Sequence, residues 1–365
     1  MELLLFRHDE FDKLYGCEGF NADKIPLEQR KDIVNGCILI TLFFIFEILY
    51  IPCMVSIYKK MDDNTCYKLM FFIGILDMLI MFINALETGI LGIIGAVYCD
   101  YPLLIYTSGT LGLALFFAET SAEMLLAINR CMELLRPQLA HAIFSGNKLR
   151  CLFALPICYG FAVAMFTKPI LFSGIYLSWF FNPYVGYTDN FGETYDNTVD
   201  DVHNFIVIFG LSTVYLLFSA LLIWKNYKLS SGQQTYQPSW TEKMSFLQVI
   251  IISLINSIAS TIYFSMQFVQ ISKIYIIIGT YAWLFSNGCP PVVYLLLNKR
   301  IRNDCANFGR AIFRFLRNDN NNSVSNGPTA MAWMTPNYAE NNANNRNNNN
   351  YNNNVPQQQR PAGTL

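Results

Sequence analysis

Seven long apolar stretches restrict this sequence to one kind of architecture. A membrane-spanning helix needs about 20 mostly apolar residues, because every backbone polar group must be hydrogen-bonded within the chain across about 30 Å of hydrocarbon. The stretches therefore predict an all-α membrane protein, a bundle of seven transmembrane helices. The predicted spans are residues 34–58, 69–94, 103–127, 149–172, 204–224, 244–269 and 274–297.

The composition agrees with lipid as the main solvent, since 53% of the 365 residues are hydrophobic and only 14% are charged. A net charge of -1 gives no reason to expect a nucleic-acid partner. The 10 cysteines form no Cys-x-x-Cys pair, so the sequence predicts no metal site and no cofactor. His8, His141 and His203 fall in predicted tail and loop positions. The sequence therefore shows no nucleophile with a neighbouring general base, and it does not predict an enzyme.

The loops between the spans differ in basic residues, which sets the orientation in the membrane. The loop around Cys99 and residues 173–203 contain no Lys or Arg, and the last loop on that side has only Lys273. Since basic loops stay in the cytoplasm, we expect the N-terminus outside the cell, although Arg30 and Lys31 before the first span oppose this assignment. The basic residues on the other side are Lys59, Lys60, Lys68, Arg136, Lys148, Arg150, Lys225, Lys228, Lys243, Lys299, Arg300 and Arg302.

Four regions are expected along the chain. They are an extracellular N-terminal segment (1–33), the seven-transmembrane domain (34–298), a short cytoplasmic amphipathic helix (299–317) and a disordered Asn-rich cytoplasmic tail (318–365). The amphipathic helix has apolar residues at helical spacing with arginines between them, which is typical of a helix on the inner leaflet. Cys305 on this helix is either a palmitoylation site or an unmodified packing residue.

Acidic residues interrupt the predicted spans. Ionisable groups are costly in hydrocarbon and usually mark functional positions. Asp77 in the second span and Glu119 in the third lie at similar depths, and Glu123 follows Glu119 by one turn on the same helix face. We expect these three residues to form an intramembrane polar or ion site that acts as a switch. A hydrogen-bonded packing network is the alternative.

The inner end of the third span contains Asn129, Arg130 and Cys131, with Glu133 one turn on. Arginines at helix ends also extend toward lipid headgroups, so Arg130 by itself does not indicate a function.

The seventh span ends with Pro290, Pro291 and Tyr294. Prolines lack a backbone N–H, free a carbonyl and bend a helix, so this pattern predicts a hinge. The alternative is a structural kink with no role in gating.

Together, Asp77, Arg130, the Pro291-x-x-Tyr294 motif and the basic helix occur in the order seen in rhodopsin-like receptors. This resemblance, which covers residues 34–317, implies a rhodopsin-like fold. It also implies that Arg130 holds the inactive state and then contacts a heterotrimeric G protein.

The chain departs from the rhodopsin-like pattern at two points of the implied activation switch, which comprises Asn129, Arg130, Pro291 and Tyr294. Asn129 replaces the acid of the usual Asp-Arg-Tyr triplet, and Glu133 is the candidate substitute. A proline also stands where the usual Asn-Pro-x-x-Tyr motif has its Asn. Asn287, one turn earlier, is the candidate for that amide.

The finer resemblance is to the nematode class T serpentine chemoreceptors (Srt). It rests on YGCEGF at residues 15–20, INRCMEL at residues 128–134 and the PxxYL-N-K-R ending of the seventh span. The resemblance implies an olfactory or gustatory receptor for a small molecule, in the plasma membrane of sensory cilia.

Two further features belong to the predicted extracellular side. The segment 173–203 has no Cys to form the disulfide common in rhodopsin-like receptors, so Cys17 and Cys99 form a bridge or remain free thiols. The acids of this segment attract cationic ligands or, as we favour, belong to a hydrated lid. We expect the ligand pocket in the outer half of the bundle, lined by Glu87, Tyr106, Tyr263, Gln267, Tyr281 and Trp283.

A ligand-gated cation channel of inverted seven-helix topology is the main alternative, because it would also be apolar, chemosensory and rich in membrane acids. Its N-terminus would lie inside, against the distribution of basic residues. A transporter ranks third, since only the seventh span is broken.

Overall fold

The computed structural model describes residues 1–18, 20, 24–62, 64–186, 192–230, 240–266 and 272–318. Residues Met1–Ala311 form one compact unit, and Ile312–Leu365 form a second. The predicted tail lies outside the described residues, apart from its first residue. The description below concerns the first unit.

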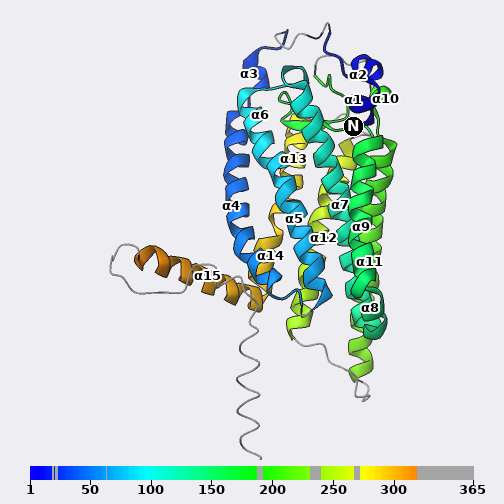
Figure 1. The fold of residues 1–365 in the computed structure, drawn as a ribbon, viewed down its shortest axis with the longest axis vertical. Helices are drawn as coiled ribbons and strands as arrows, with labels where there is room; N and C mark the ends of the chain where they lie inside the picture. The colour runs from blue at the N-terminus through cyan, green and yellow to red at the C-terminus, as the bar shows by residue number, and fades with distance from the viewer. Residues whose placement is uncertain are drawn as a thin grey trace, which may run out of the picture. The chain divides into compact units, whose positions relative to one another are not determined.

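Each predicted span falls on a helix of this unit, and the helices run side by side (Figure 1). The prediction of a helical membrane bundle is therefore confirmed. Among the described residues, 4 helices and one bent pair are long and apolar enough to cross a membrane, and α12 adds a shorter apolar helix, Ile250–Met266. The helices on which the predicted spans fall are α4 (Ile33–Tyr58), α5 (Thr65–Met81) continued by the π-helical turn η2 (Phe82–Glu87) and α6 (Thr88–Ile94), α7 (Pro102–Leu135), α9 (Gly146–Phe166), α11 (Thr198–Ser230), α12 (Trp240–Met266), and α13 (Lys273–Gly288) with α14 (Pro290–Leu297).

Short elements cover the two ends of the bundle (Figure 1). What we call the N-terminal end carries α1 (Glu2–Phe6), α2 (His8–Tyr15), α3 (Leu27–Arg30), η3 (Tyr98–Asp100), the strands β1 (Leu171–Ser173) and β2 (Ser178–Phe180), and α10 (Gly192–Tyr195). At the opposite end lie α8 (Pro137–Ile143) and the first turns of α15 (Lys299–Asn318).

Side-chain caps fix where several spans begin. The Asp32 carboxylate accepts a hydrogen bond from the backbone N–H of Asn35 at 3.1 Å, at the start of α4. The Asn64 side chain accepts from the N–H of Cys66 at 2.8 Å, at the start of α5. Such caps satisfy backbone donors that have no partner within the helix.

The fourth span was predicted to extend to residue 172, and this boundary is wrong. Helix α9 ends at Phe166, and the next apolar residues form β1, which pairs antiparallel with β2. Leu171 and Phe172 are buried within this hairpin. A short apolar run has the same composition in a buried strand as in a helix, so its periodicity did not separate the two.

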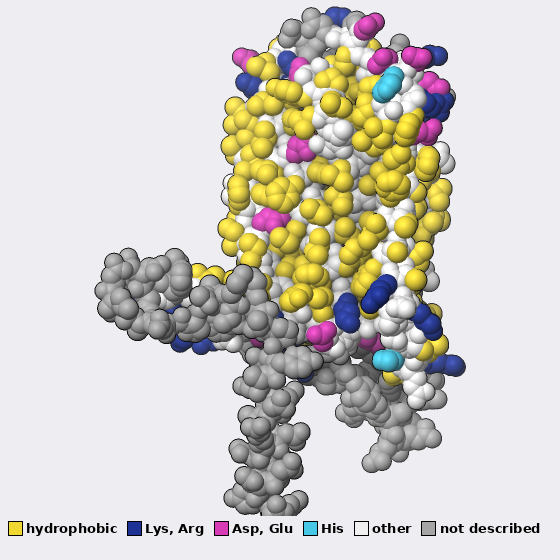
Figure 2. Space-filling model, viewed as in Figure 1, with side chains coloured by type: hydrophobic (Ala, Val, Ile, Leu, Met, Phe, Trp, Pro, Cys, Tyr) yellow, Lys and Arg dark blue, Asp and Glu magenta, His cyan; other side chains and the backbone are white. Residues whose placement is uncertain are grey.

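The bundle presents apolar side chains outward and keeps polar ones inside. A broad hydrophobic band, interrupted by a few acidic side chains, covers the middle of the visible face, while most charged side chains gather at its two ends (Figure 2). Ile48 and Phe161 are 65% and 66% exposed, whereas Asp77 and Glu119 are 1% and 2% exposed. This distribution fits a lipid environment, in which polar groups face the bundle interior.

Candidate functional site

A buried polar network joins α4, α5, η2 and α13 in the middle of the bundle. The Tyr50 hydroxyl lies 2.6 Å from Asp77 Oδ2, and the Asn287 amide donates to Asp77 Oδ1 at 3.2 Å. Asn84, which lies in η2, donates to Asn287 Oδ1 at 3.0 Å and to the Trp283 carbonyl at 3.2 Å. Asn287 therefore provides the amide that Pro290 does not provide.

The break in the seventh span is part of this network. Helices α13 and α14 meet at an angle of 48°. Pro291 has no N–H, so it leaves the carbonyl of Asn287, four residues earlier, without its helical donor. The Tyr50 hydroxyl lies 2.8 Å from that carbonyl oxygen and satisfies it. The hinge is thus held by a side chain from α4.

The intramembrane carboxylates lie next to this network. Glu119 of α7 accepts a hydrogen bond from Asn256 of α12 at 3.2 Å. Asp77, Glu119 and Glu123 lie close enough to interact electrostatically, and all three are buried. The structure therefore brings together the three acids that the sequence suggested would converge.

Arg130 lies near the end of α7, at the opposite end of the bundle from the N-terminus. Its guanidinium forms an ion pair with Glu133 at 2.9 Å, and the two side chains are 12% and 25% exposed. Asn129 is 1% exposed and faces the interior. Glu133, the candidate substitute for the acid missing at position 129, thus pairs with Arg130 in this structure.

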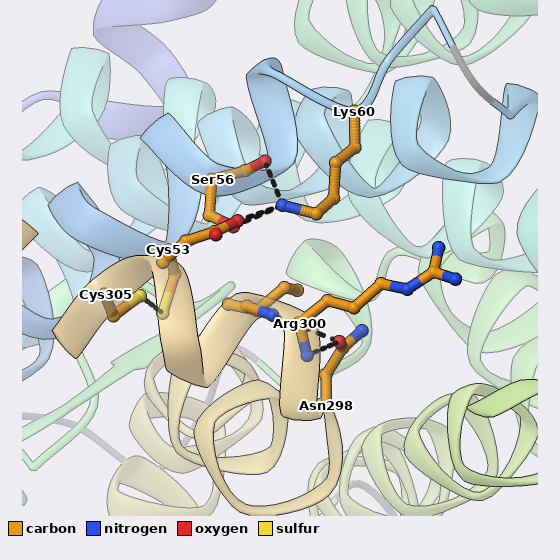
Figure 3. A network of polar contacts seen from close by, with 8 residues as sticks. Cys53, Ser56, Lys60, Asn298, Arg300 and Cys305 are labelled. Atoms are coloured by element: carbon orange, nitrogen blue, oxygen red, sulfur yellow. Dashed lines mark hydrogen bonds and ion pairs between the residues drawn. The ribbon is translucent and has the colours of Figure 1, made fainter. Parts of the chain in front are cut away.

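The first turns of α15 are attached to α4 by polar contacts (Figure 3). Asp304 pairs with Lys60 and accepts a hydrogen bond from the Ser56 hydroxyl at 2.7 Å. The Cys305 and Cys53 sulfurs lie 3.9 Å apart, and this thiol hydrogen bond lowers the pKa of Cys305. Cys305 therefore packs against α4 in this structure, while both of its predicted roles remain predictions.

The start of α15 is fixed by Asn298, which lies between α14 and α15 (Figure 3). Its Oδ1 accepts hydrogen bonds from the N–H groups of Arg300 and Ile301 at 3.1 and 3.2 Å. Tyr294, one turn before Asn298, is 3% exposed and lies near Asp77 and Glu123. The Pro-x-x-Tyr motif thus lies between the buried acids and the end of the bundle where α15 begins.

A cavity of about 370 Å³ opens at the N-terminal end of the bundle. Small-molecule sites typically measure about 300–1,000 Å³, so this cavity has the size of a ligand site. It lies between α7, α11, α12 and α13 beneath the β-hairpin. It is lined by Leu113, Phe116, Ile170, Trp179, Phe180, Phe181, Asn182, Val185, Tyr195, Asp196, Asn197, Asp200, Asn204, Ala259, Ser260, Tyr263, Met266, Ile276 and Trp283.

Of the predicted pocket residues, Tyr263 and Trp283 line this cavity and three others do not. Tyr106 packs against the N-terminal segment, with its ring 5.2 Å from that of Tyr15. Tyr281 faces α4 and donates to Asn35 Oδ1 at 2.9 Å. Glu87 is half-buried and hydrogen-bonds to Ser108. Gln267 lies outside the described residues. The sequence predicted that these side chains lie in the outer half of the bundle. The face of the helix on which each one lies depends on packing, so it was not predicted.

The N-terminal segment covers this end of the bundle. Cys17 and Cys99 form a disulfide with Cα atoms 5.7 Å apart. The hydroxyls of Tyr184 and Tyr195 donate to the backbone carbonyls of Gly16 and Leu14, both at 2.6 Å. Burial, with a smaller effect from Tyr195, raises the pKa of Tyr184 to about 12. These phenols therefore remain neutral donors and hold the segment over the bundle.

Arg30, which opposed the orientation rule, is buried in this region. It is 6% exposed and forms an ion pair with Asp100 at 3.1 Å. A buried, paired arginine is a structural element, and the orientation rule applies to solvated basic residues of short loops.

Residues 2–314 match the family described as serpentine type 7TM GPCR chemoreceptor Srt. The chain belongs to the Srt family. It is also 24% identical over 297 residues to serpentine receptor class T-55 of Caenorhabditis elegans, an alignment that covers 80% of this chain and 78% of the relative. The resemblance read from the sequence is confirmed, and the chain is a multi-pass membrane protein of a chemoreceptor family.

The Srt chain contains one buried histidine that was expected in a loop. His203 lies in α11 and is 5% exposed. Its ring nitrogens lie 2.8 Å from the Thr120 hydroxyl and 3.4 Å from the Tyr159 hydroxyl, and the ring stacks on Phe117 at 3.9 Å. These contacts join α7, α9 and α11, so the residue has a packing role.

Sequence reasoning missed several cavity residues of this Srt protein, including Trp179, Asn204 and Ser260. The acidic segment before the fifth span was the available signal, but it was interpreted as a hydrated lid. That interpretation is wrong for Asp200, which is 6% exposed and lines the cavity. It fits Asp196, whose side chain is exposed.

Proposed function

We propose that this Srt protein is a G-protein-coupled chemosensory receptor that detects an extracellular small molecule in the cavity. A continuous chain of contacts supports the proposal. Trp283 lines the cavity, and its carbonyl accepts a hydrogen bond from Asn84. Asn84 donates to Asn287, which donates to Asp77 beside the hinge. A ligand that moves Trp283 would therefore act on the hinge.

Two prolines and a tyrosine make this hinge suitable for a two-state switch. The Asn287 carbonyl is held by one hydroxyl rather than by the helix backbone. Breaking that contact changes the bend between α13 and α14 without unfolding either helix. Tyr294 follows on α14, so a change in the bend displaces a buried side chain near the acids. Packed elements of this kind transmit small shifts because they have discrete arrangements.

The proposal also assigns the orientation and the partner. The N-terminal end, with the cavity and the disulfide, would face the outside of the plasma membrane, where the environment is oxidising. The opposite end, with Arg130 and the base of α15, would face the cytoplasm and bind a heterotrimeric G protein. The Arg130–Glu133 ion pair would hold the resting state and open on activation. By family resemblance, sensory cilia are the expected site.

The substitution Arg130→Ala tests this assignment. It is expected to abolish ligand-dependent G-protein signalling in transfected cells while surface labelling of the receptor persists. Arg136→Ala is the matched control, because Arg136 lies at the same helix end and is exposed. Undiminished signalling by the Arg130 variant would count against the role of this residue. An equal loss in both variants would indicate a general effect of charge.

A further inference from the structure

The cavity has an acidic wall without a basic counterpart. Asp196 and Asp200 are the only charged residues among the described residues that line it. Asp200 is 6% exposed, and among the described residues its carboxylate forms no ion pair. Its side chain accepts a hydrogen bond from the Asn204 amide, which donates to Oδ2 at 2.9 Å. A buried carboxylate with so little compensation is costly unless a cation joins it.

Within the described ranges, no basic residue of a neighbouring segment pairs with Asp200. The sequence contains no Lys or Arg from residue 169 to residue 224, nor in residues 267–271. Lys168, the basic residue before this interval, donates to the backbone carbonyls of Thr194 and Asp196 at 2.7 and 3.0 Å. His203, one turn after Asp200, contacts Thr120 and Tyr159.

Further polar atoms of the wall lack partners within the described part of the chain. They are Oδ1 of Asn204, Oγ of Ser260 and Nε1 of Trp283, and all three side chains are at least nine-tenths buried. The Asn204 amide nitrogen donates to Asp200, so the Oδ1 of the same side chain is available as a second acceptor. Two acceptors on neighbouring side chains suit a donor with more than one N–H.

Aromatic side chains make up much of the rest of the wall, beside aliphatic ones. Phe116, Trp179, Phe181, Tyr195, Tyr263 and Trp283 line the cavity. Aromatic faces attract cations and also accept apolar groups, with the strongest effect where water is excluded. The wall therefore suits a molecule with an ammonium group at one end and an apolar body.

We propose that the cavity binds a small organic ammonium ion, with the Asp200 carboxylate as its counter-ion and Asn204 as a second acceptor. The cavity volume of about 370 Å³ restricts the ligand to a small molecule. This inference rests on the proposed function, because it assumes that the cavity is the ligand site. It names the ligand class that the receptor detects.

The test compares compounds of matched shape and different charge on the purified full-length protein. Phenethylamine, phenethyl alcohol and phenylacetate form one set, and hexylamine, hexanol and hexanoate form another. Thermal unfolding followed by fluorescence reports binding without requiring a signal. The amines are expected to raise the melting temperature more than the alcohols, and the acids not at all. Equal effects of amines and alcohols, or no effect of either amine, would overturn the proposal.

Asp200→Asn isolates the carboxylate, since it keeps the shape of the side chain. Truncating one partner of a buried charge pair typically costs a factor of about 30 or more in affinity, and this loss is expected for the amines. Asp201→Asn is the matched control, because it removes the same charge from the same turn and does not line the cavity. Retained amine affinity in the Asp200 variant would overturn the proposal. If that variant fails to fold, the comparison of amines, alcohols and acids on the unaltered protein tests the proposal by itself.

The stability of the empty receptor gives a second readout for the same variant. A counter-ion for a ligand is not compensated in the empty protein, so Asp200→Asn is expected to leave the melting temperature equal or higher. A structural role predicts a lower value. Amine binding without G-protein signalling would refute the proposed function but leave this inference intact. Signalling by neutral compounds that is unaffected by Asp200→Asn would refute this inference but leave the proposed function intact.

Discussion

The hydroxyl of Tyr50 is expected to stabilise the hinge, and Tyr50→Phe removes it without creating a cavity. The residue is fully buried, so the phenylalanine ring occupies the same space. Its hydroxyl lies 2.6 Å from Asp77 Oδ2 and 2.8 Å from the Asn287 carbonyl. The variant therefore loses a hydrogen bond to a carboxyl group and leaves a carbonyl that Pro291 has already deprived of its helical donor.

The magnitude follows from these two contacts. A hydrogen bond between neutral groups contributes about 0.5–1.5 kcal/mol, and a buried acceptor left without a partner costs about 1–3 kcal/mol. Because one hydroxyl serves both atoms, we expect a loss of about 2 kcal/mol in the free energy of unfolding. The shift per kcal/mol falls as the chain lengthens, and for a chain of this size it is about 1.5 °C, so the expected decrease is about 3 °C.

Thermal unfolding of the purified receptor in detergent micelles measures this decrease. Tyr58→Phe is the matched control, because Tyr58 lies on the same helix and is 52% exposed. The double variant with Asp77→Asn should show a coupling of about 0.5–3 kcal/mol, as expected for side chains in one hydrogen-bond network. A decrease no larger than that of Tyr58→Phe, or strictly additive effects in the double variant, would refute this reasoning.

Three further predictions concern the disulfide, the hairpin and the topology. Replacing Cys17 and Cys99 by Ser should destabilise the protein by about 2–4 kcal/mol, because the bridge closes a separation of 82 residues; an unchanged melting temperature in both oxidising and reducing buffer would contradict this. Gly109→Ala should destabilise the receptor and weaken ligand binding, since an added Cβ would overlap the Ile170 carbonyl beside the hairpin. Gly309→Ala, with no atoms near the added Cβ, should not destabilise it, so equal losses would argue against the packing explanation. Tags at the two ends of the chain should be labelled outside intact cells at the N-terminus and only after permeabilisation at the C-terminus; the reverse would support the inverted channel topology.

The motif residues were found from the sequence because their meaning is local to one helix. Pro290 and Pro291 break a helix wherever they occur in its interior, and the bend at this point follows from their missing N–H groups. Arg130 and Glu133 lie one turn apart, so the ion pair between them required only helical spacing. Asn287 was identified in the same way, one turn before the prolines.

The cavity was harder to predict, because it is formed by residues of four helices and a hairpin. Tyr281 and Trp283 are two positions apart, yet one faces α4 and the other lines the cavity. A helix advances about 100° per residue, so neighbouring aromatics point in different directions, and the sequence does not state which direction faces the bundle axis. The predicted end of the fourth span failed for a related reason, because the apolar residues that follow it are buried by a strand partner.

The sequence by itself determined the class of protein, the course of its spans and the family to which it belongs. These properties depend on the length of each apolar run and on residues placed at fixed local spacing, which the membrane imposes independently of tertiary contacts. Only the tertiary structure decided that Tyr50 satisfies the carbonyl freed by Pro291, that Arg30 is buried against Asp100, and that Asp200 faces the cavity. These two pairings and the facing of each helix depend on the rotation of one packed element against another, and that rotation is fixed by side-chain packing and hydrogen bonds between residues far apart in the chain.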